Sequence, residues 1–271
     1  MILPLYDDNA DRRRTPVVNY LLIIANVVVF VFLQGMGDDE NHFTRSFALV
    51  PEEIVTGKDL ETPDRDVVNP YTGRTYRVPG LGPTPVSVYL TLLTSIFMHS
   101  GWAHLLGNML FLWIFGDNIE DRLGPLRYLG FYLLCGILAG LAHVGVTVAL
   151  EHDTTVPCLG ASGAISGVLG GYMLLFPTRR VTVLVFRIIT QVPAFVAIGL
   201  WFLFQLLHGL GTLGDSGGGV AYGAHVGGFL AGLALITPFS LGMEPSDRDA
   251  GPWRPRRPWR PRRPGGDDSQ W

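Results

Sequence analysis

A serine hydroxyl among small residues is the first feature that could do chemistry. Ser162 lies in the stretch Gly160-Ala161-Ser162-Gly163, at the start of an apolar run of helical length. The first amide N–H groups of a helix lack intrahelical partners and favour negative charge, so they could hold an oxyanion beside this hydroxyl. The alternative is structural, because small residues also let membrane helices pack closely.

Polar side chains are few in the apolar runs, where they are costly and need an explanation. His104 and Asn108 are four residues apart, which places them on one face of a helix, and His225 stands in the last apolar run. The runs that carry Ser162 and His225 both have glycines four residues apart, which permit close helix approach: Gly163, Gly167 and Gly171, and Gly228 and Gly232. Packing through these glycines would bring His225 beside Ser162.

A serine beside a histidine can perform nucleophilic catalysis. A serine hydroxyl is a poor nucleophile until a base removes its proton, and histidine, neutral near pH 7, can be that base. We therefore predict Ser162 as the nucleophile and His225 as the base. His104 and Asn108 can donate hydrogen bonds without carrying charge, so they are candidates for holding an oxyanion.

The composition indicates an integral membrane protein, so membrane helices must position these four polar residues. Of 271 residues, 48% are hydrophobic and 16% are charged, whereas soluble domains carry about 25% charged residues. Six apolar runs predict an all-α fold of six transmembrane helices, with a short fourth helix that carries Ser162: residues 17–34, 102–119, 126–150, 160–176, 188–210 and 220–239. We interpret the first run as a retained helix rather than a cleaved signal peptide.

The basic residues orient these helices. With six spans, fifteen of the twenty Lys and Arg residues fall on the side that holds both termini. Positive charge is retained in the cytoplasm, so both termini are expected to be cytoplasmic, in a multi-pass protein of the cell membrane. Ser162 is then near the outer surface.

The chain divides into three parts on this interpretation. Residues 1–16 form the cytoplasmic N-terminus, residues 17–239 the membrane domain, and residues 240–271 an Arg/Pro-rich cytoplasmic tail that is expected to be disordered. Residues 35–98 form an outward-facing first loop, which is long enough to fold and includes a short apolar segment suited to the membrane interface.

Four short motifs, in order along the chain, resemble those of the rhomboid intramembrane serine proteases. Residues 160–163 resemble their Gly-x-Ser-Gly motif. Residues 104–108 resemble their His-x-x-x-Asn motif, which a second histidine precedes by five residues, here His99. Residues 224–232 resemble the motif of their last helix, and residues 116–120 the Gly-x-x-x-Glu that closes their second helix.

The resemblance implies a Ser-His dyad of Ser162 and His225, with an oxyanion hole built from the Ser162 amide, His104 and Asn108. It also implies cleavage in or next to a transmembrane segment of a substrate. The expected partners are transmembrane proteins and the lipid bilayer, without nucleic acid, metal or organic cofactor. Some members have an aromatic residue that stacks on the histidine four positions after the serine, where this chain has Ser166. What orients the His225 ring is therefore open.

Two alternatives to a protease remain. A catalytically inactive relative would bind membrane proteins and steer their fate, but such relatives typically lose the serine or the histidine, and this chain has both. A transporter could use His104, Asn108 and His225 as a polar path, but this function would not explain the glycines around Ser162.

Overall fold

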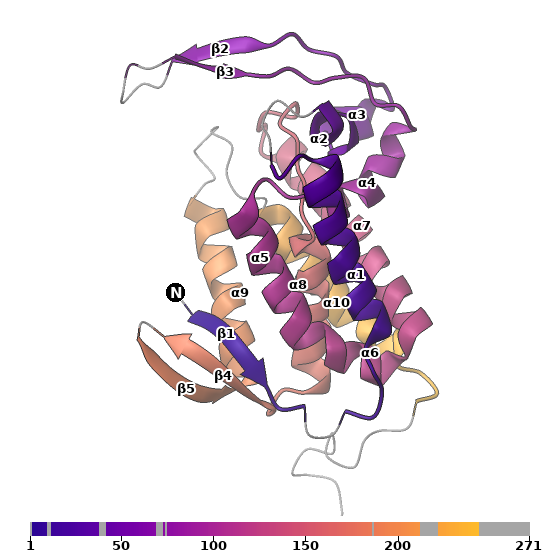
Figure 1. Cartoon of the computed structure of the whole chain (residues 1–271), viewed down its shortest axis with the longest axis vertical. Coiled ribbons are helices and arrows are strands. Elements are labelled where there is room, and N and C mark those ends of the chain that lie inside the picture. The colour runs from indigo at the N-terminus through magenta and orange to yellow at the C-terminus, as the bar shows by residue number, and fades with distance from the viewer. Residues whose placement is uncertain are drawn as a thin grey trace, which may run out of the picture.

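The protein is a bundle of helices with a small β-sheet at each end (Figure 1). The computed structural model describes residues 2–9, 12–37, 42–68, 73, 75–185, 187–211 and 222–243. Most of them are helical, as predicted, but the all-α expectation omitted the two sheets. Residues 244–271, which include most of the predicted tail, lie outside the described part of the chain.

Six helical segments follow the six apolar runs. They are α1 (Val17–Val28) with a π-helical extension (Val29–Leu33), α5 (Trp102–Phe111) with a π-helical turn (Leu112–Gly116) that leads into α6 (Asp117–Leu123), α7 (Pro125–Ala149), α8 (Ser162–Leu175), α9 (Ala194–Gly211) and α10 (Tyr222–Phe239). Among the described residues, two helices, α7 and α10, are long and apolar enough to cross a membrane. The other apolar helices are shorter, so six spans remain a prediction.

The fifth helix begins later than predicted. Residues from 188, which we expected to be helical, form strand β5 (Ile188–Pro193), which pairs with β4 (Arg180–Val185). The N-terminal strand β1 (Ile2–Asp7) completes an antiparallel sheet in the order β1-β4-β5. This segment is rich in Val, Ile and Thr, which favour strands, so the sheet displaces the start of α9 to Ala194.

The first loop is folded, as predicted. It contains α2 (His42–Phe47), α3 (Pro51–Thr56), the ribbon of β2 (Arg65–Val68) and β3 (Thr75–Val78), and α4 (Thr91–Thr94) between two 3₁₀ turns (Val88–Leu90 and Ser95–Phe97). Backbone hydrogen bonds join Leu49 to Cys158, and the Thr154 hydroxyl donates to Glu52 over 2.7 Å. The loop is therefore attached to the segment that leads into α8.

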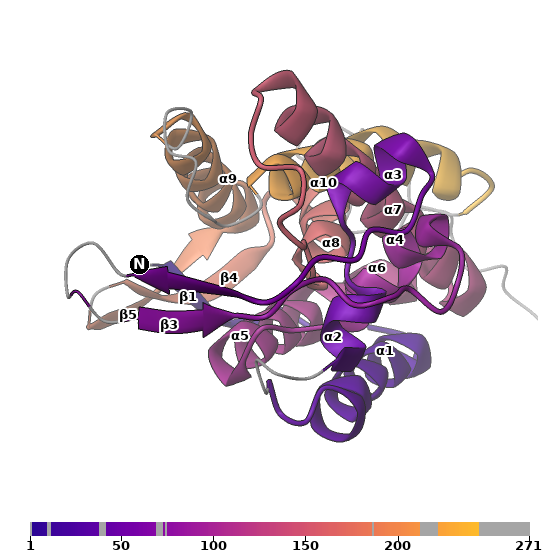
Figure 2. The same cartoon turned by 90° about the horizontal axis from the view of Figure 1, so that it is seen from above.

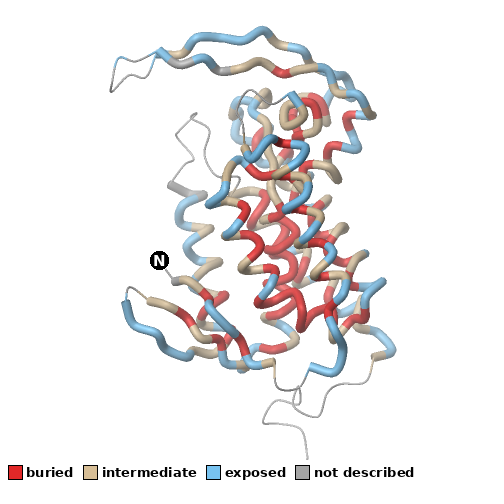
Figure 3. Tube along the Cα trace, viewed as in Figure 1, coloured by how far each residue is buried: buried red, intermediate tan, exposed pale blue. Residues whose placement is uncertain are grey.

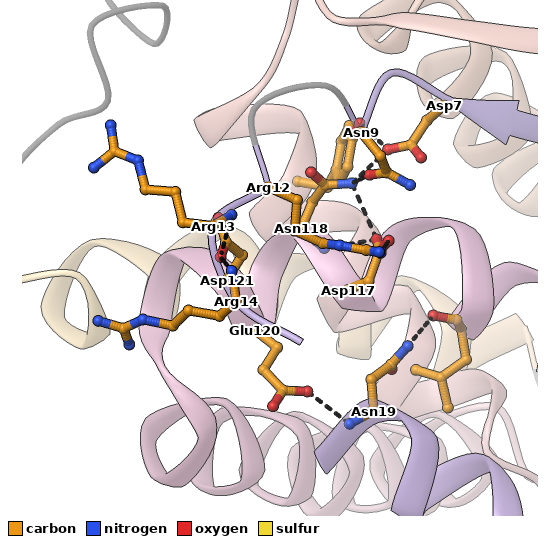
Figure 4. A network of polar contacts seen from close by, with 12 residues as sticks. Asp7, Asn9, Arg12, Arg13, Arg14, Asn19, Asp117, Asn118, Glu120 and Asp121 are labelled. Carbon is orange, nitrogen blue, oxygen red and sulfur yellow. Dashed lines mark hydrogen bonds and ion pairs between the residues drawn. The ribbon is translucent and has the colours of Figure 1, made fainter. Parts of the chain in front are cut away.

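The arginine-bearing N-terminal segment contacts the acidic residues of α6 (Figure 4). Arg12 pairs with Asp117 at 2.8 Å, and the backbone amides of Arg13 and Arg14 donate to Asp121. The Glu120 carboxylate accepts hydrogen bonds from two backbone amides in the first turn of α1, Val18 at 3.0 Å and Asn19 at 2.7 Å. These carboxylates fix the start of α1 against α6.

A buried carboxyl joins the sheet to the bundle at the same end. Asp7 of β1 is 1% exposed and accepts 2.7 Å hydrogen bonds from the Tyr172 hydroxyl of α8 and the Asn118 amide of α6. Burial raises the pKa of Asp7 to about 7; nearby Asp117 acts in the same direction, and Arg179 opposes it. Near neutral pH, a much larger share of Asp7 is therefore protonated than of an exposed carboxyl group.

Candidate active site

Helix α8 occupies the centre of the bundle, and Ser162 is its first residue. Seen from above, α8 lies among the other helices (Figure 2), and the burial map shows the inner helices as the core (Figure 3). Each residue from Gly163 to Tyr172 is buried. Gly160 has φ of 134°, a conformation that side chains rarely adopt, and its amide donates to Ser95 of the first loop. The turn before the helix is thus fixed by the backbone conformation of Gly160 and by its hydrogen bond to the first loop.

Glycines bring α8 and α10 into backbone contact, as their spacing predicted. A Cβ on Gly228 would lie 2.1 Å from the Gly163 carbonyl oxygen, and a Cβ on Gly232 would lie 2.0 Å from the Gly167 carbonyl oxygen. The third close approach differs from the prediction, since Gly170 rather than Gly171 faces an α10 backbone atom. No side chain fits between the helices at these points.

This packing places His225 beside Ser162. Nε2 of His225 lies 2.8 Å from Oγ of Ser162, within hydrogen-bond distance. His225 is buried at 9% exposure, whereas Ser162 is half-buried. The two residues that the sequence singled out, 63 positions apart, form one polar pair.

The His225 ring is oriented by residues that the sequence analysis missed. Oε1 of Gln205 in α9 lies 2.7 Å from Nδ1 of His225. Trp201 and Tyr222 flank the ring, with centroids 6.2 Å and 6.4 Å away. Ser166 turns away from the ring, since its hydroxyl donates to the Ser162 carbonyl at 2.6 Å. The signal for Gln205 was present in the sequence, as a polar residue in an apolar run.

His104 lies on another side of Ser162. A Cβ placed on Gly160 would meet Nε2 of His104 at 3.0 Å and Oγ of Ser162 at 3.5 Å, so both atoms border the same small space. Nδ1 of His104 lies 3.1 Å from the Ser100 hydroxyl. That contact holds the ring, and Nε2 borders the space next to Oγ of Ser162.

Asn108 lies one turn further along α5, on the face that carries His104. Its Nδ2 is buried and has no hydrogen-bond partner among the described residues. A buried donor without a partner is costly, so this amide is available to an acceptor that enters the site. His99 supports this region, because its ring packs edge-on against His104 and Gln34 binds its backbone amide and carbonyl.

A small pocket adjoins Ser162. Its walls are formed by the first loop, α7, the segment before α8, α8 and α10. Most of the lining residues are small or apolar; they include Leu49, Ser95, Ile96, Gly136, Ala139, Gly140, Cys158, Gly163 and Ala224. The pocket therefore offers an apolar recess next to the hydroxyl.

Comparison with known proteins identifies a matching family. The model of the Rhomboid domain matches residues 87–241, more than half of the chain. Rhomboid protein 1, mitochondrial, of Saccharomyces cerevisiae is 31% identical over 150 residues, which cover 55% of this chain and 41% of that protein. Rhomboid protease GluP of Bacillus subtilis is 34% identical over 147 residues, which cover 54% of this chain and 26% of that protein.

Mammalian proteins also match. The human presenilin-associated rhomboid-like protein, mitochondrial, is 27% identical over 184 residues, which cover 60% of this chain and 44% of that protein. The matched regions thus span less than half the length of each of these relatives.

Proposed function

The chain belongs to the rhomboid family of helical membrane proteins, and from this membership together with the site geometry we propose that it is an intramembrane serine endopeptidase. The observation that carries the proposal is the 2.8 Å contact between Nε2 of His225 and Oγ of Ser162. A hydroxyl at the start of a buried helix, hydrogen-bonded to an imidazole, is the arrangement needed for an activated nucleophile. The substrates are the transmembrane segments of other membrane proteins.

Ser162 attacks the scissile carbonyl carbon, and His225 acts first as general base and then as general acid. As the bond from Oγ to carbon forms, Nε2 of His225 takes the hydroxyl proton. The imidazolium then gives this proton to the leaving amide nitrogen, which releases one product and leaves an acyl group on Ser162. Water repeats the sequence with the same base and frees the second product. Catalysis requires neither a metal ion nor an organic cofactor.

Donors at the edge of the site hold the oxyanion. Nδ2 of Asn108, Nε2 of His104 and the Ser162 amide at the helix start are the groups we assign to this role. The Asn108 amide supports the assignment, because a negatively charged oxygen gives it the acceptor that it lacks among the described residues. The adjacent apolar recess would take a small substrate side chain.

The same proposal includes the arrangement in the bilayer. Six helices span the cell membrane, with the first loop outside, both termini in the cytoplasm and residues 240–271 as a cytoplasmic tail. Support comes from the meeting of the segments that carry Arg12 and Arg179 at one end of the bundle, while Ser162 begins α8 at the other end (Figure 1). Reporter fusions at residue 60 and at the C-terminus test this orientation; a C-terminal reporter on the outer side would overturn it.

Fluorophosphonate labelling tests the proposed chemistry. Detergent-solubilised wild type should react with the probe, whereas Ser162→Ala and His225→Ala should not, because the pair acts as a unit. The same variants should fail to cleave a transmembrane substrate in proteoliposomes. If folded wild-type protein neither labels nor cleaves, the proposal is wrong and the inactive binding protein becomes the better interpretation.

A further inference from the structure

The Gln205 side chain makes a specific contact with the histidine of the candidate dyad. Oε1 of Gln205 lies 2.7 Å from Nδ1 of His225, on a partly buried side chain of α9. A carboxamide oxygen can only accept a hydrogen bond. Because Oε1 can only accept, the imidazole must be the donor. A hydrogen bond therefore forms only when Nδ1 carries the ring proton.

The proton on Nδ1 decides what the other ring nitrogen can do. A neutral imidazole has one N–H and one lone pair. With Nδ1 protonated, the lone pair is on Nε2, which lies 2.8 Å from Oγ of Ser162. Nε2 can then accept the serine proton, whereas in the opposite tautomer Nε2–H would point at the hydroxyl and could not act as a base.

We propose that Gln205 is a positioning residue that selects the active tautomer of His225 and fixes the direction of its ring. This inference rests on the proposed protease function. The role is that of the third member of a catalytic triad, performed by a neutral amide instead of a carboxylate. A neutral acceptor suits this position, because a carboxylate would be costly in an apolar helix.

The rest of the ring environment leaves this role open for Gln205. The Trp201 ring is tilted by 40° and the Tyr222 ring by 88° relative to the imidazole, at centroid distances above 6 Å, so neither is stacked on it. Ser166 is engaged with its own helix. Flanking rings restrict where the imidazole can move, but a hydrogen bond is required to specify which nitrogen carries the proton.

Substitutions of nearly constant size test the proposal. Gln205→Met removes the acceptor and keeps the length of the side chain; it should lower kcat about 10- to 100-fold with KM unchanged, and slow fluorophosphonate labelling in parallel, as loss of an orienting partner does elsewhere. Gln205→Glu keeps an oxygen acceptor; the cost of a carboxylate in an apolar helix should appear as lower stability, while the folded variant should keep kcat within a few-fold of wild type. Gln191→Met is the control, since Gln191 lies on exposed β5, away from the site.

The outcomes separate this inference from the proposed function. Wild-type kcat in Gln205→Met, or equal losses in the Met and Glu variants, would overturn the role of Gln205 while leaving the protease intact. An inactive wild type would overturn both. The ¹⁵N spectrum of the His225 ring gives a test without any variant: we expect the Nδ1–H tautomer, and finding the Nε2–H tautomer in the resting protein would refute the proposal.

Discussion

Gly232 of α10 faces the backbone of Gly167 in α8, and its replacement by alanine should force these two helices apart. The added Cβ would lie 2.0 Å from the Gly167 carbonyl oxygen and 2.6 Å from its Cα. These are backbone atoms, which cannot rotate away as a side chain can. A contact of 3.4 Å, the beginning of ordinary van der Waals distance, requires a separation of about 1.4 Å at this level.

The separation reaches the candidate dyad, because Ser162 and His225 belong to the same two helices. If the helices move apart as rigid bodies, the present 2.8 Å between Oγ and Nε2 becomes about 4 Å, which is too long for a hydrogen bond. A misplacement of 1 Å can cost about 10²-fold in rate. We therefore expect Gly232→Ala to lower kcat by about 100-fold or more.

The assay is cleavage of a transmembrane substrate in proteoliposomes, with thermal unfolding to show that the variant is folded. Gly199→Ala is the matched control: a Cβ at Gly199 of α9 meets no atom within 4 Å, so kcat should match wild type. If folded Gly232→Ala keeps more than a tenth of wild-type kcat, the argument that glycine packing sets the distance between Ser162 and His225 is refuted.

Three further predictions concern single polar groups. Asn108→Ala should lower kcat about 10²- to 10³-fold yet still label with fluorophosphonate, since the serine and its base are untouched; complete loss of labelling would show that Asn108 also holds the structure. The pKa of Asp7 is about 7 in the folded protein against 3.8 for the ordinary group, so the contribution of Asp7 to stability is fully present below about pH 4 and is lost as the pH rises to about 7. Asp7→Asn should remove this loss, on the order of 3 kcal/mol between pH 5 and 8, and denaturant unfolding at both pH values checks it. Glu120→Ala removes the acceptor for two amides at the start of α1 and should lower the thermal unfolding midpoint while kcat at low temperature is unchanged; an unaltered midpoint would contradict this.

The candidate site could be anticipated because its determinants are short patterns. Glycines four residues apart on two apolar helices specify a close approach, and that approach decides which side chains meet. The same spacing argument placed His104 and Asn108 on one helical face. The helix that carries Ser162 also begins at that residue, as the Gly-Ala-Ser-Gly stretch indicated.

Features that depend on distant pairing were not predicted. Residues 2–7 appeared as a short segment before the first helix, and their strand forms only because β4, far along the chain, supplies hydrogen-bond partners. The β5 strand was read as the beginning of a helix for a different reason: its residues continue directly into the apolar run of α9, and the β-branched residues that favour a strand were not separated from that run. Gln205 is visible in the sequence as a polar residue in an apolar run, but its partner is not: the contact with a ring nitrogen of another helix depends on how α9 packs against α10.

The pairing of β1 with β4 has a consequence for the order of assembly. Ile2 pairs with Val185, so the first strand to be synthesised meets its partner about 180 residues later. At roughly 5–20 residues per second, β1 waits on the order of ten to forty seconds on the ribosome with an unpaired edge, which is the state in which strands mispair. The sheet can close only after the helix that carries Ser162 has been made. Docking of the N-terminus therefore follows synthesis of α8 but can precede synthesis of α9 and α10, which come after β4 in the chain.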